Sequence, residues 1–346
     1  MKIGIFFEGR KKKDMGGGFY LQVRNAQLIN KLKDEFSEIY LISSDDNTSN
    51  YLKEKNYNLK NFRYNFLNKY TSKLFTFNYI KDFFQKIKIH HPFYNFLKKN
   101  DFDLIVFLNP SNFANFCGDK SFIINIWDLD HKYNSQFPEH TSNYTYEKRE
   151  KLISNVIFRA FKIFVPHEKI KKDLVKIYRC NEEIIEVQTL IPYPPELYLE
   201  NKNKIDYNKL FLKLNLPINK KYIIYPAAYW PHKNHKYIID AALKLKSAKK
   251  NFHFIFCGPD IGNYKYIKKN ITNNKLENCI STCNLLNDNE LISLYLNCSA
   301  VIMPTYGGPT NLPIFESFFF KKPIFYSDQL LDDSELKNSV ISIDFS

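Results

Sequence analysis

The chain reads Pro304-Thr-Tyr-Gly-Gly-Pro-Thr-Asn-Leu-Pro-Ile-Phe-Glu316 directly after an apolar run at residues 300–303. The run predicts the end of a buried strand, and the turn residues after it predict a loop that leads into a helix. Thr310 and Asn311 are favourable N-cap residues. Pro313 suits the first helical turn, where a missing backbone N–H costs nothing. A buried strand, a loop and a helix in this order are typical of an α/β fold.

The start of the predicted helix is a candidate anion site, because it offers free backbone amides and the positive end of the helix dipole. We place Glu316 in the first turn, at about 1.5 Å of rise per residue from those amides. One ligand can then set a phosphate on the amides and a ribose diol on the carboxylate, as a sugar nucleotide does. The alternative is structural, since the dipole alone favours Glu in a first turn and Asn-Leu-Pro alone is a helix start signal.

The length and composition of the chain favour two domains. A chain of 346 residues is longer than one hydrophobic core usually grows. An apolar share of 44%, with 31 Phe and 24 Tyr, supplies ample core material. No run of about 18 or more apolar residues occurs, so the sequence predicts no transmembrane helix. Residues 1–8 read as a short strand followed by Glu8 rather than as a signal peptide.

The cysteines indicate the redox state of the compartment, and the net charge indicates possible binding partners. The six cysteines are scattered and show no zinc-ligand spacing, which fits a reducing cytoplasm. The formal net charge of +14 suggests nucleic acid, an anionic membrane surface or phosphorylated substrates as partners. The lysines are spread along the chain, so we do not expect nucleic acid. We expect a cytoplasmic protein, with peripheral contact at the inner face of an anionic membrane.

Apolar strand-like runs alternate with helix-like segments, which predicts two doubly wound parallel sheets with helices on both faces. Residues 50–100 show no clear pattern. In the first half the predicted strands are residues 3–7, 39–43, 103–108, 122–127, 161–165 and 184–190, with helices near residues 23–32, 146–160 and 168–178. In the second half the predicted strands are residues 222–225, 252–257, 280–283, 301–303, 323–326 and 340–343, with helices at residues 235–249, 264–273 and 288–296 and after residue 311.

The stretch Ile191-Pro-Tyr-Pro-Pro195 interrupts both patterns, and a polar Asn/Lys-rich stretch follows it. Such a stretch is the best candidate for a domain boundary. We therefore expect Rossmann-like domains at residues 1–195 and 209–346, joined by a linker at residues 196–208. Two such units bind ligands at the carboxyl ends of their strands, facing a shared cleft.

Gly16, Gly17 and Gly18 lie between the first predicted strand and helix, where backbone can approach a phosphate or a sugar closely. Their spacing differs from G-x-G-x-x-G, so they indicate a dinucleotide only weakly. The alternative for these glycines is a flexible surface loop.

The stretch Tyr229-Trp-Pro-His-Lys-Asn-His235 follows the first strand of the second half. Lys233 can pair with a diphosphate as a point charge, and the alternative is solvent exposure, the usual place of a lysine. His232 and His235 are three residues apart. No carboxylate or cysteine completes a metal site with them, so we expect no metal.

The stretch Trp127-Asp-Leu-Asp-His131 lies at the carboxyl end of a predicted strand, with Phe137-Pro-Glu139 beyond it. Asp128 and His131 are candidate polar groups on the acceptor side of a cleft. A capping Asp and a surface His are the alternatives.

These stretches, in this order, resemble the retaining glycosyltransferases of family four, which have the two-domain GT-B fold. The resemblance covers nearly the whole chain. It is closest to a subgroup with W-D-L-x-H near Trp127, H-K-N-H at His232 and P-T-Y-x-G-P-T-N-L-P-x-x-E at Pro304. It implies an acceptor-side N-terminal domain and a C-terminal domain that binds the nucleotide-diphosphate sugar.

The resemblance also implies roles for single residues. Lys233 would contact the diphosphate, and His131 and Asp128 would face the acceptor and the transferred sugar. The catalytic set is then His131, Asp128, Lys233 and Glu316. The donor would be bound by Gly17, Gly18, Lys233, Gly258, Leu285, Leu286, Thr310, Asn311, Leu312 and Glu316, with the ribose hydroxyls on Glu316.

The sequence departs from the family at three of its motifs. Many relatives carry a glutamate where Gly308 stands, an arginine about where Ala228 stands, and a histidine at the start of the H-D motif, where Trp127 stands. Relatives also continue into a last helix, whereas this sequence ends at Ser346 after a predicted strand.

The expected activity is metal-independent transfer of a sugar from a nucleotide donor to a hydroxyl, with retained anomeric configuration. We expect a glycan or lipid-linked acceptor in surface polysaccharide or lipopolysaccharide synthesis and no cofactor. The alternatives are an epimerase or hydrolase of the same fold and a non-catalytic module that binds sugar nucleotides.

Overall fold

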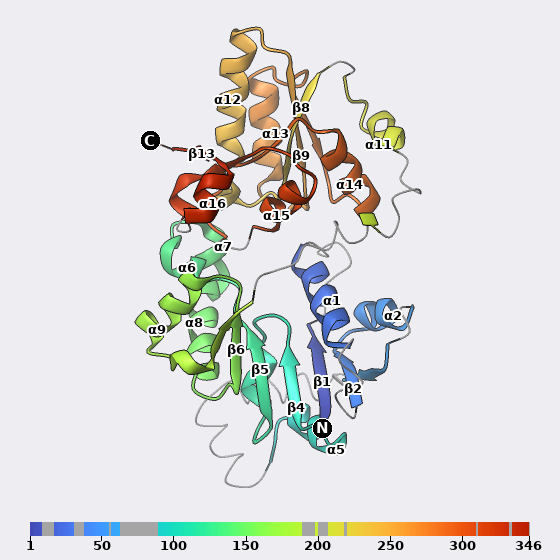
Figure 1. Cartoon of the computed structure of the whole chain (residues 1–346), viewed down its shortest axis with the longest axis vertical. Coiled ribbons are helices and arrows are strands. Elements are labelled where there is room, and N and C mark those ends of the chain that lie inside the picture. The colour runs from blue at the N-terminus through green and yellow to red at the C-terminus, as the bar shows by residue number, and fades with distance from the viewer. Residues whose placement is uncertain are drawn as a thin grey trace. The chain divides into compact units, whose positions relative to one another are not determined.

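The chain forms two compact α/β units. The computed structural model describes residues 1–8, 17–30, 38–54, 57–62, 89–188, 198–199, 207–217, 220–308, 311–331 and 334–345. Unit 1 comprises Met1–Leu129 and Glu147–Thr189, and unit 2 comprises Asp130–Tyr146 and Leu190–Ser346. Each unit is a parallel sheet with helices packed on it (Figure 1).

The sheet of unit 1 has seven strands in the order β3-β2-β1-β4-β5-β6-β7. Every pair of neighbours is parallel, so each connection crosses over the sheet. The strands are β1 Lys2–Phe7, β2 Glu38–Ser43, β3 Leu59–Asn61, β4 Leu104–Phe107, β5 Ser121–Asn125, β6 Lys162–Val165 and β7 Ile185–Val187.

Unit 1 buries apolar side chains on both faces of its sheet. Along β1, Ile5 and Phe7 belong to one hydrophobic cluster and Phe6 between them belongs to another, because successive side chains of a strand point to opposite faces. The helices and short 3₁₀ turns of this part are α1 Gly17–Asn30, α2 Asp46–Glu54, α5 Pro92–Lys99, η2 Asn112–Phe116, α8 Thr145–Val156, α9 Glu168–Tyr178 and η4 Glu182–Ile184.

The sheet of unit 2 has six parallel strands in the order β10-β9-β8-β11-β12-β13. The strands are β8 Lys221–Pro226, β9 Phe252–Cys257, β10 Ile280–Cys283, β11 Ala300–Met303, β12 Ile324–Ser327 and β13 Ile341–Ile343. All residues of β9 and of β11 are buried, as expected for strands covered on both faces.

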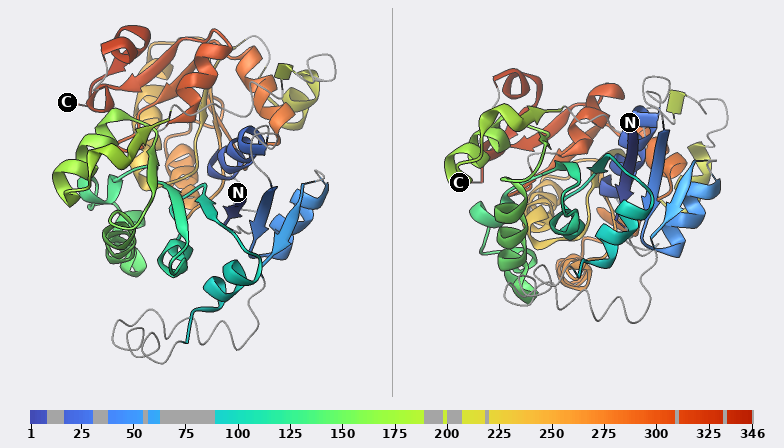
Figure 2. Two further views of the ribbon diagram at one scale, coloured as in Figure 1. Left: turned by 60° about the horizontal axis from the view of Figure 1, so that its bottom comes forward. Right: turned by 90° about the horizontal axis from the view of Figure 1, so that it is seen from below.

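The helices of unit 2 have clear start signals. In α14, Asn287 and Glu290 form a capping box, and Asn234 caps α12 through its side chain. The helices and 3₁₀ turns are α6 Asp130–Tyr133, α7 Pro138–Thr141, η3 Ser142–Tyr144, α11 Tyr207–Lys213, η6 Pro231–Lys233, α12 His235–Ser247, α13 Tyr264–Asn273, α14 Asp288–Asn297, α15 Leu312–Phe319, η7 Asp328–Leu330 and α16 Ser334–Ser339. Figure 2 shows the two sheets from other directions, with the blue, cyan and green strands in unit 1 and the orange and red strands in unit 2.

The predicted α/β fold with two Rossmann-like sheets is confirmed. The unit boundaries differ from the predicted domains in two respects. Unit 1 ends at Thr189 rather than at residue 195. Residues 130–146 were expected in the N-terminal domain, but they group with unit 2, so the chain leaves unit 1 after Leu129 and returns at Glu147. Among the described residues, no helix is long and apolar enough to cross a membrane.

Candidate functional site

The candidate site lies where the strand order of unit 2 reverses. Strands β8 and β11 are neighbours, and the chain runs from β8 toward β9 and β10 on one side and from β11 toward β12 and β13 on the other. The loops that leave the carboxyl ends of two such strands diverge, which makes this point the usual ligand site of an open parallel sheet. The loop after β8 carries Lys233, and the loop after β11 leads to α15.

The side chain of Lys233 is directed at the start of α15. Its Nζ donates to Oδ1 of Asn311 at 3.0 Å and to the carbonyl of Gly307 at 3.5 Å. Its own carbonyl accepts from the hydroxyl of Tyr225 at 2.6 Å, which ties the loop to β8. Lys233 is therefore held beside the predicted diphosphate site and is only partly exposed.

The loop after β11 is closed by its own hydrogen bonds. The hydroxyl of Thr305 donates to the carbonyl of Gly307 at 2.7 Å, and the amide of Tyr306 donates to the carbonyl of His232 at 2.9 Å. Gly308 has a φ of 91°, and a Cβ there would lie 3.2 Å from Nζ of Lys233. A residue with a side chain would be strained in this conformation.

Asn311 occupies the N-cap position of α15, as predicted, but its side chain does not cap the helix. Its Nδ2 donates to the hydroxyl of Tyr326 at 2.7 Å, and its Oδ1 accepts from Lys233. Asn311 thus bridges β12 and the Lys233 loop. Leu312 begins the helix, and the predicted contact Thr310 lies outside the described residues.

Glu316 is buried, with 5% exposure, and it accepts a hydrogen bond from the hydroxyl of Tyr295 on α14. The prediction that it lies in the first turn is wrong, because α15 begins at Leu312 and its first turn holds no acidic residue. An interaction with the helix dipole therefore does not explain this carboxylate. Burial raises the pKa of Glu316 to about 7, although the Tyr295 hydrogen bond lowers it.

Asp128 and His131 fall in different units. Asp128 forms an ion pair with Arg149 of α8, and Arg149 also donates to the Asp128 carbonyl at 2.9 Å. His131, on α6 of unit 2, is completely buried and meets the ring of Tyr146 edge-on at 5.3 Å. A surface histidine is thus excluded for His131, and the carboxylate of Asp128 is ion-paired.

Glu139 and His140 lie beside His232, where sequence reasoning expected no carboxylate. Oε1 of Glu139 accepts from the His232 amide at 2.9 Å and pairs with Nδ1 of its ring. Ligand atoms of Glu139, His140 and His232 all lie within 4.8 Å of one another. The argument that no carboxylate reaches His232 is therefore wrong, because a residue 93 positions earlier does so. His235 lies elsewhere, packed against Tyr225 and Tyr229.

The protonation states of the Glu139–His232 pair follow from burial and contact. Burial lowers the pKa of His232 to about 4, and the positive charge of Lys233 acts in the same direction, against the Glu139 contact. Burial pushes the pKa of Glu139 upward, but the hydrogen bonds from His232 outweigh it and leave this pKa lowered. At neutral pH a neutral imidazole therefore donates from Nδ1 to an ionised carboxylate.

The other predicted donor contacts follow strands of unit 2. Gly258 directly follows β9, and a Cβ there would lie 2.1 Å from the carbonyl oxygen of Ala227, so only glycine fits without a backbone shift. Leu285 and Leu286 lie between β10 and α14. Leu285 is 40% exposed, whereas Leu286 packs against the core of unit 2.

Unit 1 has its own reversal point, between β1 and β4. Gly17 and Gly18 begin α1 there, while Gly16 lies outside the described residues. Glu8 directly follows β1, and Asn109 is the second residue after β4. Nδ2 of Asn109 donates to Oε2 of Glu8 at 2.9 Å. Sequence reasoning missed Asn109, although a polar residue just after a buried strand is the signal that could have found it.

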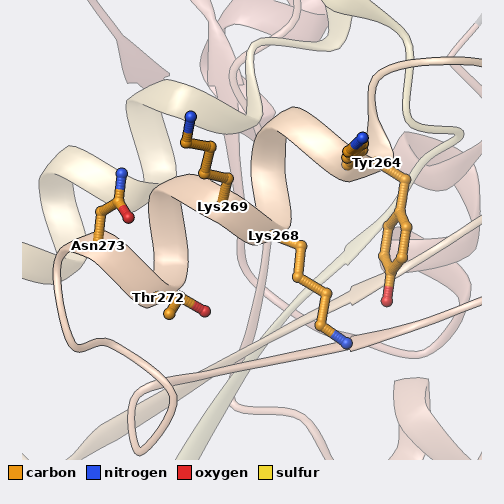
Figure 3. A pocket seen from close by; sticks show the side chains of 6 residues that line it. Tyr264, Lys268, Lys269, Thr272 and Asn273 are labelled. Atoms are coloured by element: carbon orange, nitrogen blue, oxygen red, sulfur yellow. The ribbon is translucent and has the colours of Figure 1, made fainter.

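A separate hollow runs along the outside of α13. It is lined by Tyr264, Lys265, Lys268, Lys269, Thr272 and Asn273 (Figure 3). It holds no carboxylate or histidine, and its residues come from one helix. The chemistry of the candidate site is therefore not found there.

Comparisons with known proteins concern the fold and one stretch of the chain. Residues 206–332 match the model of the family described as glycosyl transferases group 1. A glycosyltransferase from Rickettsia africae ESF-5 aligns with a TM-score of 0.64 and 17% identity over 94% of this chain and 79% of that one. Anabaena Alr3699/HepE in complex with UDP-glucose aligns with a TM-score of 0.67 and 17% identity over 95% and 80%.

WaaG, a glycosyltransferase involved in lipopolysaccharide biosynthesis, aligns with a TM-score of 0.64 and 14% identity over 100% of this chain and 87% of that one. At these identities the likeness shows the fold alone. The search of curated proteins finds no match. The chain thus has the GT-B fold, and its residues 206–332 are similar to the glycosyl transferases group 1 family.

Proposed function

We propose that the chain transfers a sugar from a nucleotide-diphosphate donor to a hydroxyl acceptor, with retention of the anomeric configuration. One observation carries the proposal. At the reversal point of unit 2, Lys233 is hydrogen-bonded to the N-cap residue of α15, and the same helix carries the buried carboxylate of Glu316. Lys233 and the first amides of α15 can thus bind a diphosphate together, and Glu316 of the same helix is an acceptor for a ribose diol.

The chemistry requires stabilisation of the departing diphosphate. The glycosidic bond to the nucleotide breaks with an oxocarbenium-like centre on the sugar, and negative charge develops on the diphosphate. Lys233 and the first amides of α15, with Thr310, Asn311 and Leu312, receive that charge. Glu316 binds the ribose hydroxyls, and Gly258, Leu285 and Leu286 border the nucleotide. The similarity of the fold to Alr3699/HepE, which was solved with UDP-glucose, supports this class of donor.

The acceptor belongs to surface polysaccharide or lipopolysaccharide synthesis in this proposal. The fold of WaaG, a protein of lipopolysaccharide biosynthesis, supports it. The net charge of +14 suits an acceptor on the inner face of an anionic membrane, where each basic residue near the surface adds about 1 kcal/mol.

A screen of nucleotide sugars by thermal shift tests the donor class, because a ligand that binds the folded state raises its melting temperature. Donors that shift the melting temperature are then assayed for turnover with and without glycan acceptors. Transfer to an acceptor with retained configuration supports the proposal. Sugar release or isomerisation without an acceptor indicates a hydrolase or epimerase, and binding without turnover indicates a non-catalytic module.

The same assay tests metal independence. Because Lys233 and the helix amides neutralise the diphosphate, activity should persist in EDTA. Loss of activity in EDTA that Mn²⁺ or Mg²⁺ restores would show that a metal takes this part instead.

A further inference from the structure

We propose that Glu139 is a positioning residue of the donor site. It fastens residues 130–146 to His232 and thereby holds Lys233 where the diphosphate binds. The inference rests on the proposed function, because it assigns Glu139 a task at that same site. It is carried by contacts within unit 2.

The carboxylate of Glu139 accepts hydrogen bonds from two donors of His232. Its side chain is 4% exposed, and its Oε1 accepts both from the backbone amide of His232 and from the ring Nδ1. A buried carboxylate is costly unless donors compensate it, so this geometry fixes the peptide and the ring of His232 together. The ring of His140 lies 5.6 Å from that of His232 and packs against it.

The peptide of His232 also contacts the other loop of the candidate site, which follows β11. Its carbonyl accepts from the amide of Tyr306 at 2.9 Å and from the hydroxyl of Thr305 at 3.3 Å. The next residue is Lys233, whose Nζ reaches Asn311. A shift of His232 would therefore move the lysine and the turn at residues 305–308 together.

Residues 130–146 also contact the loop after β11 through other side chains. The ring of Phe137 lies 5.3 Å from that of Tyr306, and Nδ2 of Asn134 donates to the Tyr306 carbonyl at 3.4 Å. A Cβ on Gly307 would lie 2.8 Å from Oδ2 of Asp130. Helices α6 and α7 accordingly lie with unit 2, although they connect two strands of unit 1 (Figure 1). Glu139 hydrogen-bonds this segment to the Lys233 loop.

The alternative is that Glu139, His140 and His232 bind a divalent metal, because their ligand atoms lie within 4.8 Å of one another. The direct contact between Oε1 of Glu139 and Nδ1 of His232 already occupies one ligand atom of each residue. The positive charge of Lys233 acts on His232 and opposes a second cation there. These two observations favour a hydrogen-bonded pair.

The test measures UDP affinity by calorimetry, with ADP and GDP as further probes, for the wild type, E139A, E139Q, K233A and the double variant E139A/K233A. E139A should weaken binding about tenfold, because a displaced Lys233 loses its charged hydrogen bond to the diphosphate. E139Q keeps an acceptor oxygen for the His232 amide and should lose less. E147A is the matched control, because Glu147 is exposed at the start of α8.

The double variant separates positioning from a general structural role. If Glu139 acts through Lys233, E139A should add little to the loss in K233A, and the two effects should be coupled. Additive losses, or equal affinities of wild type and E139A, would overturn the inference. Should E139A not fold, the same cycle with E139Q decides.

Metal binding and the absence of nucleotide binding would each have a different meaning. Tight Zn²⁺ binding by the wild type that E139Q abolishes would overturn the inference in favour of a metal site. If the wild type binds no nucleoside diphosphate, the proposed function fails and the inference fails with it. Binding that E139A leaves unchanged overturns the inference alone.

Discussion

Glu316 combines burial with an unusual pKa. Its carboxyl group is enclosed and accepts from Tyr295, and burial raises its pKa to about 7. An ionised carboxylate accepts from both hydroxyls of a ribose through its two oxygens, whereas a protonated carboxyl group carries a donor proton on one of them. The protonation state of one residue therefore sets whether the proposed ribose contact can form near neutral pH.

We predict that nucleotide affinity depends on pH through Glu316. UDP affinity should rise from pH 6 to pH 8 as the carboxyl group ionises, and E316Q should remove this rise. At pH 8, E316Q should weaken binding about tenfold to a hundredfold, since a hydrogen bond to a charged group contributes about 1.5–3 kcal/mol. Calorimetry at pH 6, 7 and 8 measures both effects. A wild-type affinity that does not vary with pH would contradict the assignment.

Lys233 should act mainly on the developing charge of the leaving diphosphate. K233A is then expected to lower kcat much more than it raises the donor KM, because the interaction is stronger in the transition state than with bound donor. Steady-state kinetics over a range of donor concentrations measures the two constants. A raised KM with unchanged kcat would mean that Lys233 only binds the donor. K236A is the control, because Lys236 is exposed and pairs with Asp240 on the outside of α12.

At the scale of elements, the loops that leave β8 and β9 approach each other closely. A Cβ on Gly258 would meet the carbonyl carbon and oxygen of Ala227 and the amide of Ala228, all of them backbone atoms. Backbone cannot rotate away as a flexible side chain can. The closeness of these two strand ends is therefore a structural reason for glycine, beside its proposed place near the nucleotide.

G258A should lower the free energy of unfolding by about 1–3 kcal/mol, the usual cost of overpacking. Urea unfolding followed by circular dichroism measures it. G262A is the comparison, since nothing lies within 4 Å of a Cβ there and only its φ of 110° opposes the substitution. If G258A were no worse than G262A, the close approach would not constrain this position.

Local sequence patterns predicted many elements well. The predicted bounds of α9, β9, α13 and β10 agree with the structure, because periodicity, caps and β-branched runs are local signals. Between residues 50 and 100, the end of α2, β3 and α5 gave no such pattern. The start of α5 is set by the His91 side chain and Pro92, and its buried Phe93 packs against Phe6 of β1, a contact that no local pattern reveals.

At the scale of the whole molecule, four buried histidines have depressed pKa values. Burial lowers the pKa of His91 and His235 to about 3 and of His232 and His253 to about 4. Both units contain such a residue. Among the described residues, neither ring nitrogen of His235 has a hydrogen-bond partner.

These histidines predict acid sensitivity. Their pKa is lower in the folded state than the usual 6.5, so the unfolded chain binds more protons as the pH falls below that value. The stability that they contribute is present above pH 6.5 and is lost as the pH falls toward 4. Urea unfolding at pH 7, 5.5 and 4.5 should show this loss. H235F should reduce the pH dependence whatever its effect at pH 7, and an unchanged dependence would contradict the prediction.

The amino-acid sequence was enough to predict two Rossmann-like sheets and the Lys233 and Asn311 loops, because strand and helix patterns and turn residues are local properties of the chain. Three-dimensional packing was needed to place Glu316 in the second turn, His131 in the interior and Glu139 against His232. The turn that holds Glu316 depends on where α15 starts. The burial of His131 and the contact of Glu139 depend on which distant residues pack against them. A contact across 93 residues leaves no mark on either segment, so only the folded chain reveals it.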